Sequence, residues 1–209
     1  MLLFVHSTFR LIAKYLCEAT KICQKDDIIT TALRLFNSYS YNSIGVDRII
    51  SESGVAKMTF YKYFPSKEKL IEECLLLRNS LLQNSLTAAI SKEDETNPLA
   101  RIKAIFLWYS DWFNSEDFNG CMFQKALEEV LKQYPSTHQP ATLYKIWLTQ
   151  LMQDLLIQYE IEESRPLALL LVNILEGMTI QAQVEHGSVK IDDYWKRVEK
   201  LIEFEKIAH

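Results

Sequence analysis

Residues 44–64 read IGVDRIISESGVAKMTFYKYF, and apolar residues are regularly spaced along this segment on both sides of Gly54. Val46, Ile49 and Ile50 are spaced i, i+3 and i+4, which predicts a short amphipathic helix. Gly54 supplies the positive-φ residue that ends such a helix, and Val55 fills the corner. Residues 57–64 then carry apolar and aromatic side chains over two further turns. Two short helices joined by so tight a corner predict a helix-turn-helix, whose second helix has the size of a DNA major groove.

The flanking sequence predicts a helix on each side of this corner. Residues 28–36 repeat apolar side chains at helical spacing. Downstream, Pro65 blocks continuation of the second helix, and Ser66 is a natural N-cap for a new one. Residues 67–90 then read as one long helix. The corner therefore lies inside a small helical head that leads into a longer helical segment.

This arrangement resembles the DNA-binding domain of the tetracycline-repressor (TetR) family of bacterial transcriptional regulators, over about residues 27–75. The resemblance implies a cytoplasmic homodimer that binds a palindromic operator in double-stranded DNA. It also implies a repressor that a small-molecule effector releases from the operator. The most specific parts of the match are Leu35-Phe36, Ile49, Gly54-Val55 and Thr59-Phe60-Tyr61-x-x-Phe64-x-Ser66-Lys67-Glu68.

The resemblance also implies which residues face the DNA. We expect Lys57, Thr59 and Lys62 near base edges and phosphates, and Phe60 and Phe64 in the core of the head. The remaining expected contacts are to the DNA backbone, from Tyr61, Tyr63, Lys67 and the backbone N–H of Gly45.

The sequence departs from the family pattern where short helices begin. Family members usually have Gly at the place of Ser40, Thr or Ser at the places of Ile44 and Gly45, and Ser at the place of Ala56. The hydroxyl groups that cap helices or touch phosphates are therefore missing at these positions. The chain therefore lacks the side-chain groups for the contacts that the family pattern implies there, although the backbone N–H of Gly45 remains.

Composition and charge agree with a helical chain that binds DNA at one end. The 209 residues are 48% hydrophobic and include only five Gly and five Pro, and strand-like alternation is absent, so we expect an all-α fold of about nine helices. Net charge is −4, yet residues 1–70 carry ten Lys and Arg against six Asp and Glu. Residues 71–209 carry thirteen against twenty-one. The basic excess lies in the head, where phosphate binding needs it.

We expect three parts along the chain. Residues 26–72 form the DNA-binding head, and residues 73–209 form a body for ligand binding and dimerisation. Residues 1–25 are longer than the arm usual before this motif, and three explanations stay open for them: a basic amphipathic helix, a disordered segment, or a start codon assigned too far upstream. Charged residues interrupt their apolar start, so neither a signal peptide nor a membrane span fits.

The segment 166–184 is apolar nearly all round, which indicates a helix that buries two faces. We expect one face to meet the body and the other a second copy of the chain, together with the helix at 192–207. A monomer with a central buried helix is the alternative. The residues expected at the dimer interface are Leu167, Leu170, Leu171, Ile174, Met178, Tyr194, Trp195 and Val198.

Between head and interface lies a cluster of large aromatic side chains with a few polar neighbours. Proteins that this chain resembles enclose a small-molecule pocket in this region, and a carboxylate there favours a cationic or hydroxyl-bearing ligand. For each residue, ordinary core packing or an inter-helix bond is the alternative. The candidate ligand-binding residues are Phe106, Tyr109, Trp112, Phe113, Phe123, Gln124, Glu128, Trp147, Asn173 and Glu176.

Other classes of function find little support. The four cysteines and four histidines form no metal-ligand spacing, so we expect no metal or other cofactor and reduced thiols. No nucleophile elbow or phosphate loop is present, which argues against an enzyme. The main alternative is a protein-interaction module whose helix-turn-helix no longer binds DNA.

Overall fold

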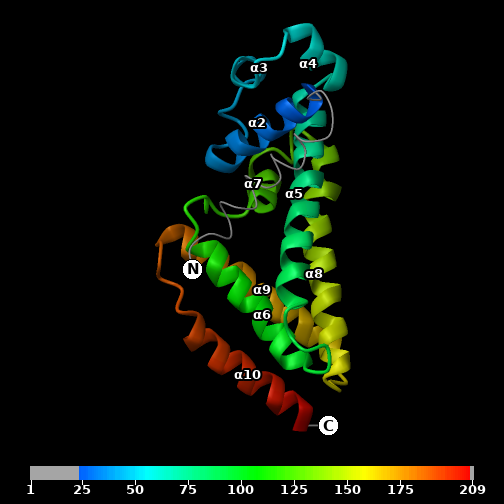
Figure 1. The fold of residues 1–209 in the computed structure, drawn as a ribbon, viewed down its shortest axis with the longest axis vertical. Coiled ribbons are helices and arrows are strands. Elements are labelled where there is room, and N and C mark those ends of the chain that lie inside the picture. The colour runs from blue at the N-terminus through cyan, green and yellow to red at the C-terminus, as the bar shows by residue number, and fades with distance from the viewer. Residues whose placement is uncertain (1–23, 208–209) are drawn as a thin grey trace. The chain divides into compact units, whose positions relative to one another are not determined.

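The computed structural model describes residues 24–207, and it confirms the expected all-α fold (Figure 1). This part of the chain contains nine α-helices, one 3-10 helix and no strand. The expectations for residues 1–23 lie outside the described residues. In chain order the helices are α2 (Gln24–Ser38), α3 (Val46–Ser53), α4 (Lys57–Tyr63), α5 (Lys67–Ile90), α6 (Pro98–Phe113), α7 (Met122–Glu129), η1 (Pro135–Thr137), α8 (His138–Gln158), α9 (Ser164–Val184) and α10 (Ile191–Ile207).

Proline residues mark the limits of two helices in the middle of the chain. We expect helices at residues 122–134 and 143–159 from the sequence, but α8 begins earlier, at His138, because Pro140 falls in its first turn, where the missing N–H would have no partner. Helix α7 ends at Glu129, short of residue 134. Tyr134 precedes Pro135, and a residue before proline is disfavoured in the helical conformation.

The chain forms two compact units, and the first is discontinuous in sequence. Unit 1 comprises Met1–Arg78 and Met122–Ala141, and unit 2 comprises Asn79–Cys121 and Thr142–His209. Unit 1 is therefore larger than the head expected at residues 26–72, since it also contains α7 and η1. The chain crosses between the units within α5, before α7 and within α8.

The core of unit 1 is built around α2, which contacts both α3 and α4 (Figure 1). Phe36, Phe60 and Phe64 are completely buried there. The rings of Phe60 and Phe64 are 6.0 Å apart, and Phe36 packs on Tyr41 at 4.8 Å. These contacts confirm that Phe60 and Phe64 belong to the core of the head.

The corner between α3 and α4 has the geometry expected from its glycine. Gly54 adopts φ 71° and ψ 11°, the left-handed conformation that ends a helix. A Cβ atom added at Gly54 would meet nothing within 4 Å, so only the backbone conformation demands glycine. Val55 is buried beside it, as expected.

Helix α7 supplies hydrogen-bond donors to the end of α2. The ammonium of Lys125 donates to the carbonyl oxygens of Phe36 at 3.0 Å and Asn37 at 2.9 Å. The last carbonyl groups of a helix lack partners inside it, and a cation is favourable at that end. Lys125 therefore caps α2 from a segment almost ninety residues further along the chain.

Glu129 fixes the connection that runs from α2 to α3. Its carboxylate accepts hydrogen bonds from the Ser40 hydroxyl at 2.6 Å and from the backbone N–H of Tyr41 at 2.7 Å. The carbonyl of the same glutamate accepts from the Asn42 side chain at 3.1 Å. The Tyr41 hydroxyl donates to the carbonyl of Met122 at 3.1 Å. Helix α7 therefore holds the segment that leads into α3.

Unit 2 is a helical body in which α6 contacts both α9 and α10 (Figure 1). Phe106 of α6 is fully buried and packs against Trp195 of α10, with ring centroids 5.7 Å apart. Among the described helices, only α9 is long and apolar enough to cross a membrane by length and composition. Within its apolar window, 44% is buried inside the structure.

Replacing Gly54 with Ala will lower the free energy of unfolding by about 1 kcal/mol, because Ala is strained at positive φ. Urea unfolding followed by circular dichroism measures the change. Gly54→Asn is the matched control, since Asn tolerates the left-handed conformation and will cost less. Equal decreases in the two variants would contradict the conformational explanation.

Glu129→Ala will lower the free energy of unfolding by about 1–3 kcal/mol, because the buried N–H of Tyr41 is left without its acceptor. The neighbouring Glu128→Ala is the control, because Glu128 is exposed and accepts a hydrogen bond from Gln124 of its own helix. That change will stay within about 0.5 kcal/mol. Similar values for both variants would show that α7 does not stabilise the head.

Candidate DNA-binding site

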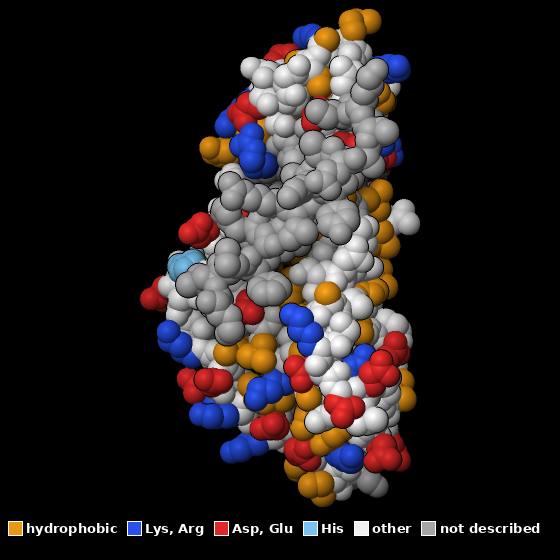
Figure 2. Space-filling model, viewed as in Figure 1, with side chains coloured by type: hydrophobic (Ala, Val, Ile, Leu, Met, Phe, Trp, Pro, Cys, Tyr) orange, Lys and Arg blue, Asp and Glu red, His pale blue; other side chains and the backbone are white. Residues whose placement is uncertain are grey.

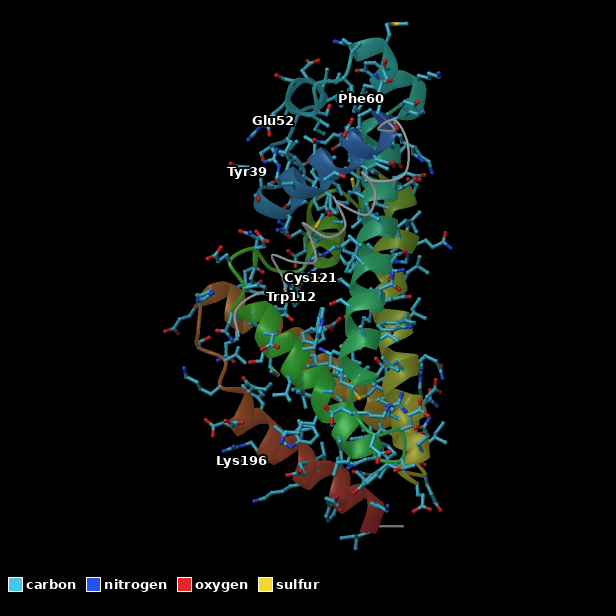
Figure 3. All side chains as sticks on the ribbon, viewed as in Figure 1. Tyr39, Glu52, Phe60, Trp112, Cys121 and Lys196 are labelled. Carbon is cyan, nitrogen blue, oxygen red and sulfur yellow. The ribbon has the colours of Figure 1, made fainter. Side chains whose placement is uncertain are left out.

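The buried side of α4 determines which of its residues reach the surface. Phe60 is completely buried, and the residues on the opposite side of the helix are exposed. Figure 3 labels Phe60 on α4 and shows side chains projecting outward from this end of unit 1. The exposed residues of α4 are Lys57, Met58, Tyr61 and Lys62.

The residues of α4 that are expected to contact DNA differ in how far they are exposed to solvent. Lys57 and Lys62 are exposed, and 43% of Tyr61 is accessible. Thr59 and Tyr63 are half-buried beside them. The Lys57 ammonium lies 3.2 Å from Asp47, but both side chains are largely exposed, so this ion pair is weak.

Lys67 lies differently from the other candidate DNA contacts. Its ammonium donates to the carbonyl oxygen of Tyr41 at 2.5 Å and is half-buried. Burial lowers the pKa of Lys67, and the carboxylate of Glu129 partly opposes that effect. Lys67 therefore binds the connection between α2 and α3, the same segment that Glu129 of α7 binds.

A network of charged side chains that the sequence did not predict joins α2 to α3. Glu52 accepts hydrogen bonds from Arg34 of α2 and from Arg48 of its own helix, the latter at 2.8 Å. These bonds, Arg48 first, lower the pKa of Glu52. The Arg48 guanidinium also lies over the ring of Tyr39 at 4.6 Å, and Figure 3 labels Tyr39 and Glu52. The i, i+4 spacing of Arg48 and Glu52 was the only sequence signal for this network.

Helices α3 and α4 begin without side-chain caps, as the absence of hydroxyl groups at these positions predicts. Gly45 precedes α3 and Ala56 precedes α4, and neither has a side-chain capping bond. The N–H groups at these starts are available to an external acceptor, which suits the expected role of the Gly45 backbone. Ser66 does cap α5, since its hydroxyl accepts from the N–H of Lys69 at 3.1 Å.

The candidate ligand-binding residues fall into both units. Phe123, Gln124 and Glu128 are on α7 in unit 1, where Gln124 bonds to the exposed Glu128. The others are in unit 2, where Asn173 is exposed and Glu176 pairs with Lys145 at 2.7 Å. Both placements favour the ordinary structural alternative for these polar residues.

An aromatic cluster within unit 2 brings several of the other candidates together. The ring of Tyr109 lies 5.8 Å from those of Trp112 and Phe113. Its hydroxyl is 3.4 Å from that of Tyr144, whose ring packs on Trp147 at 5.7 Å. Burial raises the pKa of Tyr109 well above its ordinary value. Figure 3 labels Trp112 together with Cys121, which is also in unit 2.

Most of the residues expected at the dimer interface lie in the protomer's own core. Phe106 covers Trp195, and Tyr194 donates a hydrogen bond to Gln181 of α9. Ile174 is half-buried, and of the expected residues only Leu170 is exposed, at 46%. The sequence could not separate the two faces of an all-apolar helix. The expected residues that are buried are Leu167, Leu171, Met178, Trp195 and Val198.

The face of α9 that stays exposed has a regular spacing. Leu170, Asn173, Gly177, Ile180 and Val184 follow one another at steps of three and four residues, and all five are exposed. Such spacing forms a narrow seam along one side of a helix.

Among the described residues no group of three or more His, Cys, Asp or Glu side chains could hold a metal ion.

Comparison with known proteins identifies the family to which the helix-turn-helix belongs. The profile of the family "Bacterial regulatory proteins, tetR family" matches residues 28–74. The transcriptional regulator LmrA of Bacillus subtilis is 30% identical over 144 residues, which cover 68% of this chain and 75% of that protein. The uncharacterised regulator YxaF of the same organism is 26% identical over 157 residues, covering 73% and 81%.

Solved structures share the fold at lower sequence identity. A TetR-family transcriptional regulator from Streptomyces coelicolor superimposes with a TM-score of 0.77 at 21% identity, over 88% of this chain and 96% of that one. Reduced NemR from Escherichia coli gives 0.74 at 18% identity, over 85% and 96%. LmrA and the Streptomyces coelicolor protein are both described as transcriptional regulators. With the helix-turn-helix of α3 and α4 on a helical body, the chain belongs to the TetR family, and unit 1 carries its DNA-binding domain.

Proposed function

We propose that this regulator is a cytoplasmic homodimer that represses genes from a palindromic operator until a small molecule releases it. The observation that carries the proposal is the outward face of α4, where Lys57, Tyr61 and Lys62 are exposed on a helix anchored by Phe60. Thr59, Tyr63 and the N–H of Gly45 lie within the same helix-turn-helix and add contacts to DNA.

A second copy of the chain is the partner that suits the exposed seam of α9. The seam combines three apolar residues with Asn173 and Gly177. Gly177 has no Cβ and lets a facing helix approach closely, and a polar Asn on such a seam can fix its register. Two copies also place two heads on DNA, whose half-sites are about 34–36 Å apart.

The path from body to head runs along the segments that cross between the units. Helix α5 passes from one unit to the other, and α7 is joined to unit 2 at Cys121 and through α8. Lys125 and Glu129 connect α7 to the end of α2 and the start of α3. A change in unit 2 that moves α7 will therefore shift α3 and α4. A shift of a few ångströms prevents both heads from docking at once.

The aromatic cluster of unit 2 is the proposed binding region for the effector. Tyr109, Trp112 and Trp147 offer ring faces that suit an aromatic or cationic molecule. In this proposal the Tyr109 hydroxyl, 3.4 Å from that of Tyr144, orients a polar group of the ligand.

Selection of genomic fragments with the purified protein tests the central claim. Recovery of one palindromic sequence supports a repressor, and recovery of none favours the interaction module. All four tryptophans lie in unit 2, so their fluorescence reports the body while labelled operator reports the head. Tetraphenylphosphonium, a neutral aromatic compound and a fatty acid are suitable first probes of release.

Lys62→Ala will weaken operator binding and reduce the slope of log affinity against log salt by about 0.9 for each phosphate that the variant no longer neutralises. Titrations of labelled operator at several salt concentrations measure the slope. Lys92→Ala is the control, because Lys92 is an exposed cation of unit 2. An unchanged slope for Lys62→Ala would remove this residue from the set that binds DNA.

Leu170→Glu will convert the dimer to a monomer, because it places a charge on the apolar seam of α9. Sedimentation velocity measures the mass, and circular dichroism checks that the helices persist. Ile146→Glu on α8, where Ile146 is 62% exposed, is the matched control and will remain a dimer. The opposite pattern would move the interface to α8.

A further inference from the structure

Met58 is the most exposed large hydrophobic side chain among the described residues, with 84% of its surface accessible. It precedes the buried Phe60 by two positions on α4, so the two side chains point to opposite sides of the helix. The anchoring of Phe60 in the core therefore holds Met58 outward. Its exposure follows from the fold and is not the result of a loose helix end.

The neighbours of Met58 form a small surface with two kinds of chemistry. Tyr61 lies one turn further along the same side of α4, and its ring is held edge-on against Phe60 at 5.3 Å. Lys57 and Lys62 are exposed on either side. Figure 2 shows hydrophobic and basic side chains next to one another at the α3 and α4 end of unit 1. An apolar centre flanked by cations suits a groove with negatively charged edges.

We propose that Met58 is a specificity-determining residue that reads the C5-methyl group of a thymine in the operator. The inference deepens the proposed function and rests on it. Base edges in the major groove present hydrogen-bond donors and acceptors, and the thymine methyl is their one apolar feature. A thioether side chain makes no strong hydrogen bond, but it is flexible and polarizable and packs well against a methyl group.

The chemistry assigns different tasks to the residues of this surface. The contacts of Lys57 and Lys62 to phosphates contribute affinity without distinguishing one base from another. Met58 distinguishes thymine from bases without a C5-methyl group. Removing the methyl group from the base weakens binding roughly fourfold, which corresponds to the transfer of one carbon from water.

The test uses the operator that wild-type protein selects, with its thymines replaced by deoxyuridine at one symmetric pair of positions at a time. Deoxyuridine keeps every hydrogen-bonding group and removes only the methyl. Anisotropy of labelled duplexes at fixed salt gives the affinities. At one pair of positions the affinity of wild-type protein will fall roughly fourfold per half-site, and Met58→Ala will bind both duplexes equally. Met58→Leu is the control, because it stays apolar and keeps a preference for thymine.

Each other outcome overturns the inference. If no deoxyuridine substitution weakens wild-type binding, the operator is bound without recognition of a methyl group. If the affinity of Met58→Ala falls as much as that of wild type at the same positions, another residue reads the methyl. Both results leave operator binding itself intact. If wild-type protein selects no palindrome, the proposed function fails and the role of Met58 fails with it.

Discussion

The carbonyl groups that end α2 are the constraint on which unit 1 depends. Helix ends leave such groups without partners, and here the donor comes from Lys125 of α7. Glu129, one turn further on, binds the backbone that follows. Lys67 of α5 donates to the same connection from another direction. The start of α3, and through Gly54 the direction of α4, therefore follow from hydrogen bonds between distant parts of the sequence.

Burial of aromatic rings determines what the head presents to DNA. With Phe60 and Phe64 in the core, α4 has one remaining free side. The network of Arg34, Glu52 and Arg48 then joins α2 to α3 beside it. Short helices are rarely stable alone, so α3 and α4 depend on these tertiary interactions for their helical conformation. The exposed surface of α4 is thus held in place by the buried rings and by the charged network beside it.

Local patterns were sufficient to predict the helices, but they did not reveal the contacts between distant segments or the buried face of α9. Gly54, Pro65 and Ser66 act on their own neighbourhood, so the corner and the start of α5 could be read directly. The hydrogen bonds of Lys125 and Glu129 join residues more than eighty positions apart, and no local pattern reveals them. The hydrogen bond of Lys67 to the carbonyl of Tyr41 also joins separate segments, so the sequence did not predict it either. Helix α9 is apolar on nearly every side, so its sequence could not predict that Met178 is buried and Ile180 is exposed.

Because unit 1 is built from two separate segments of the sequence, the DNA-binding head cannot be moved to another protein as one continuous segment. A fragment that stops at Arg78 lacks α7, so the Tyr41 N–H is without the Glu129 carboxylate and the α2 carbonyls are without Lys125. On the ribosome, the head cannot complete its hydrogen bonds until residue 129 has left the exit tunnel. Exchange of heads between related regulators must likewise carry α7 along with α2–α5, or match its lysine and glutamate. Two separated pieces of sequence must therefore be inherited together.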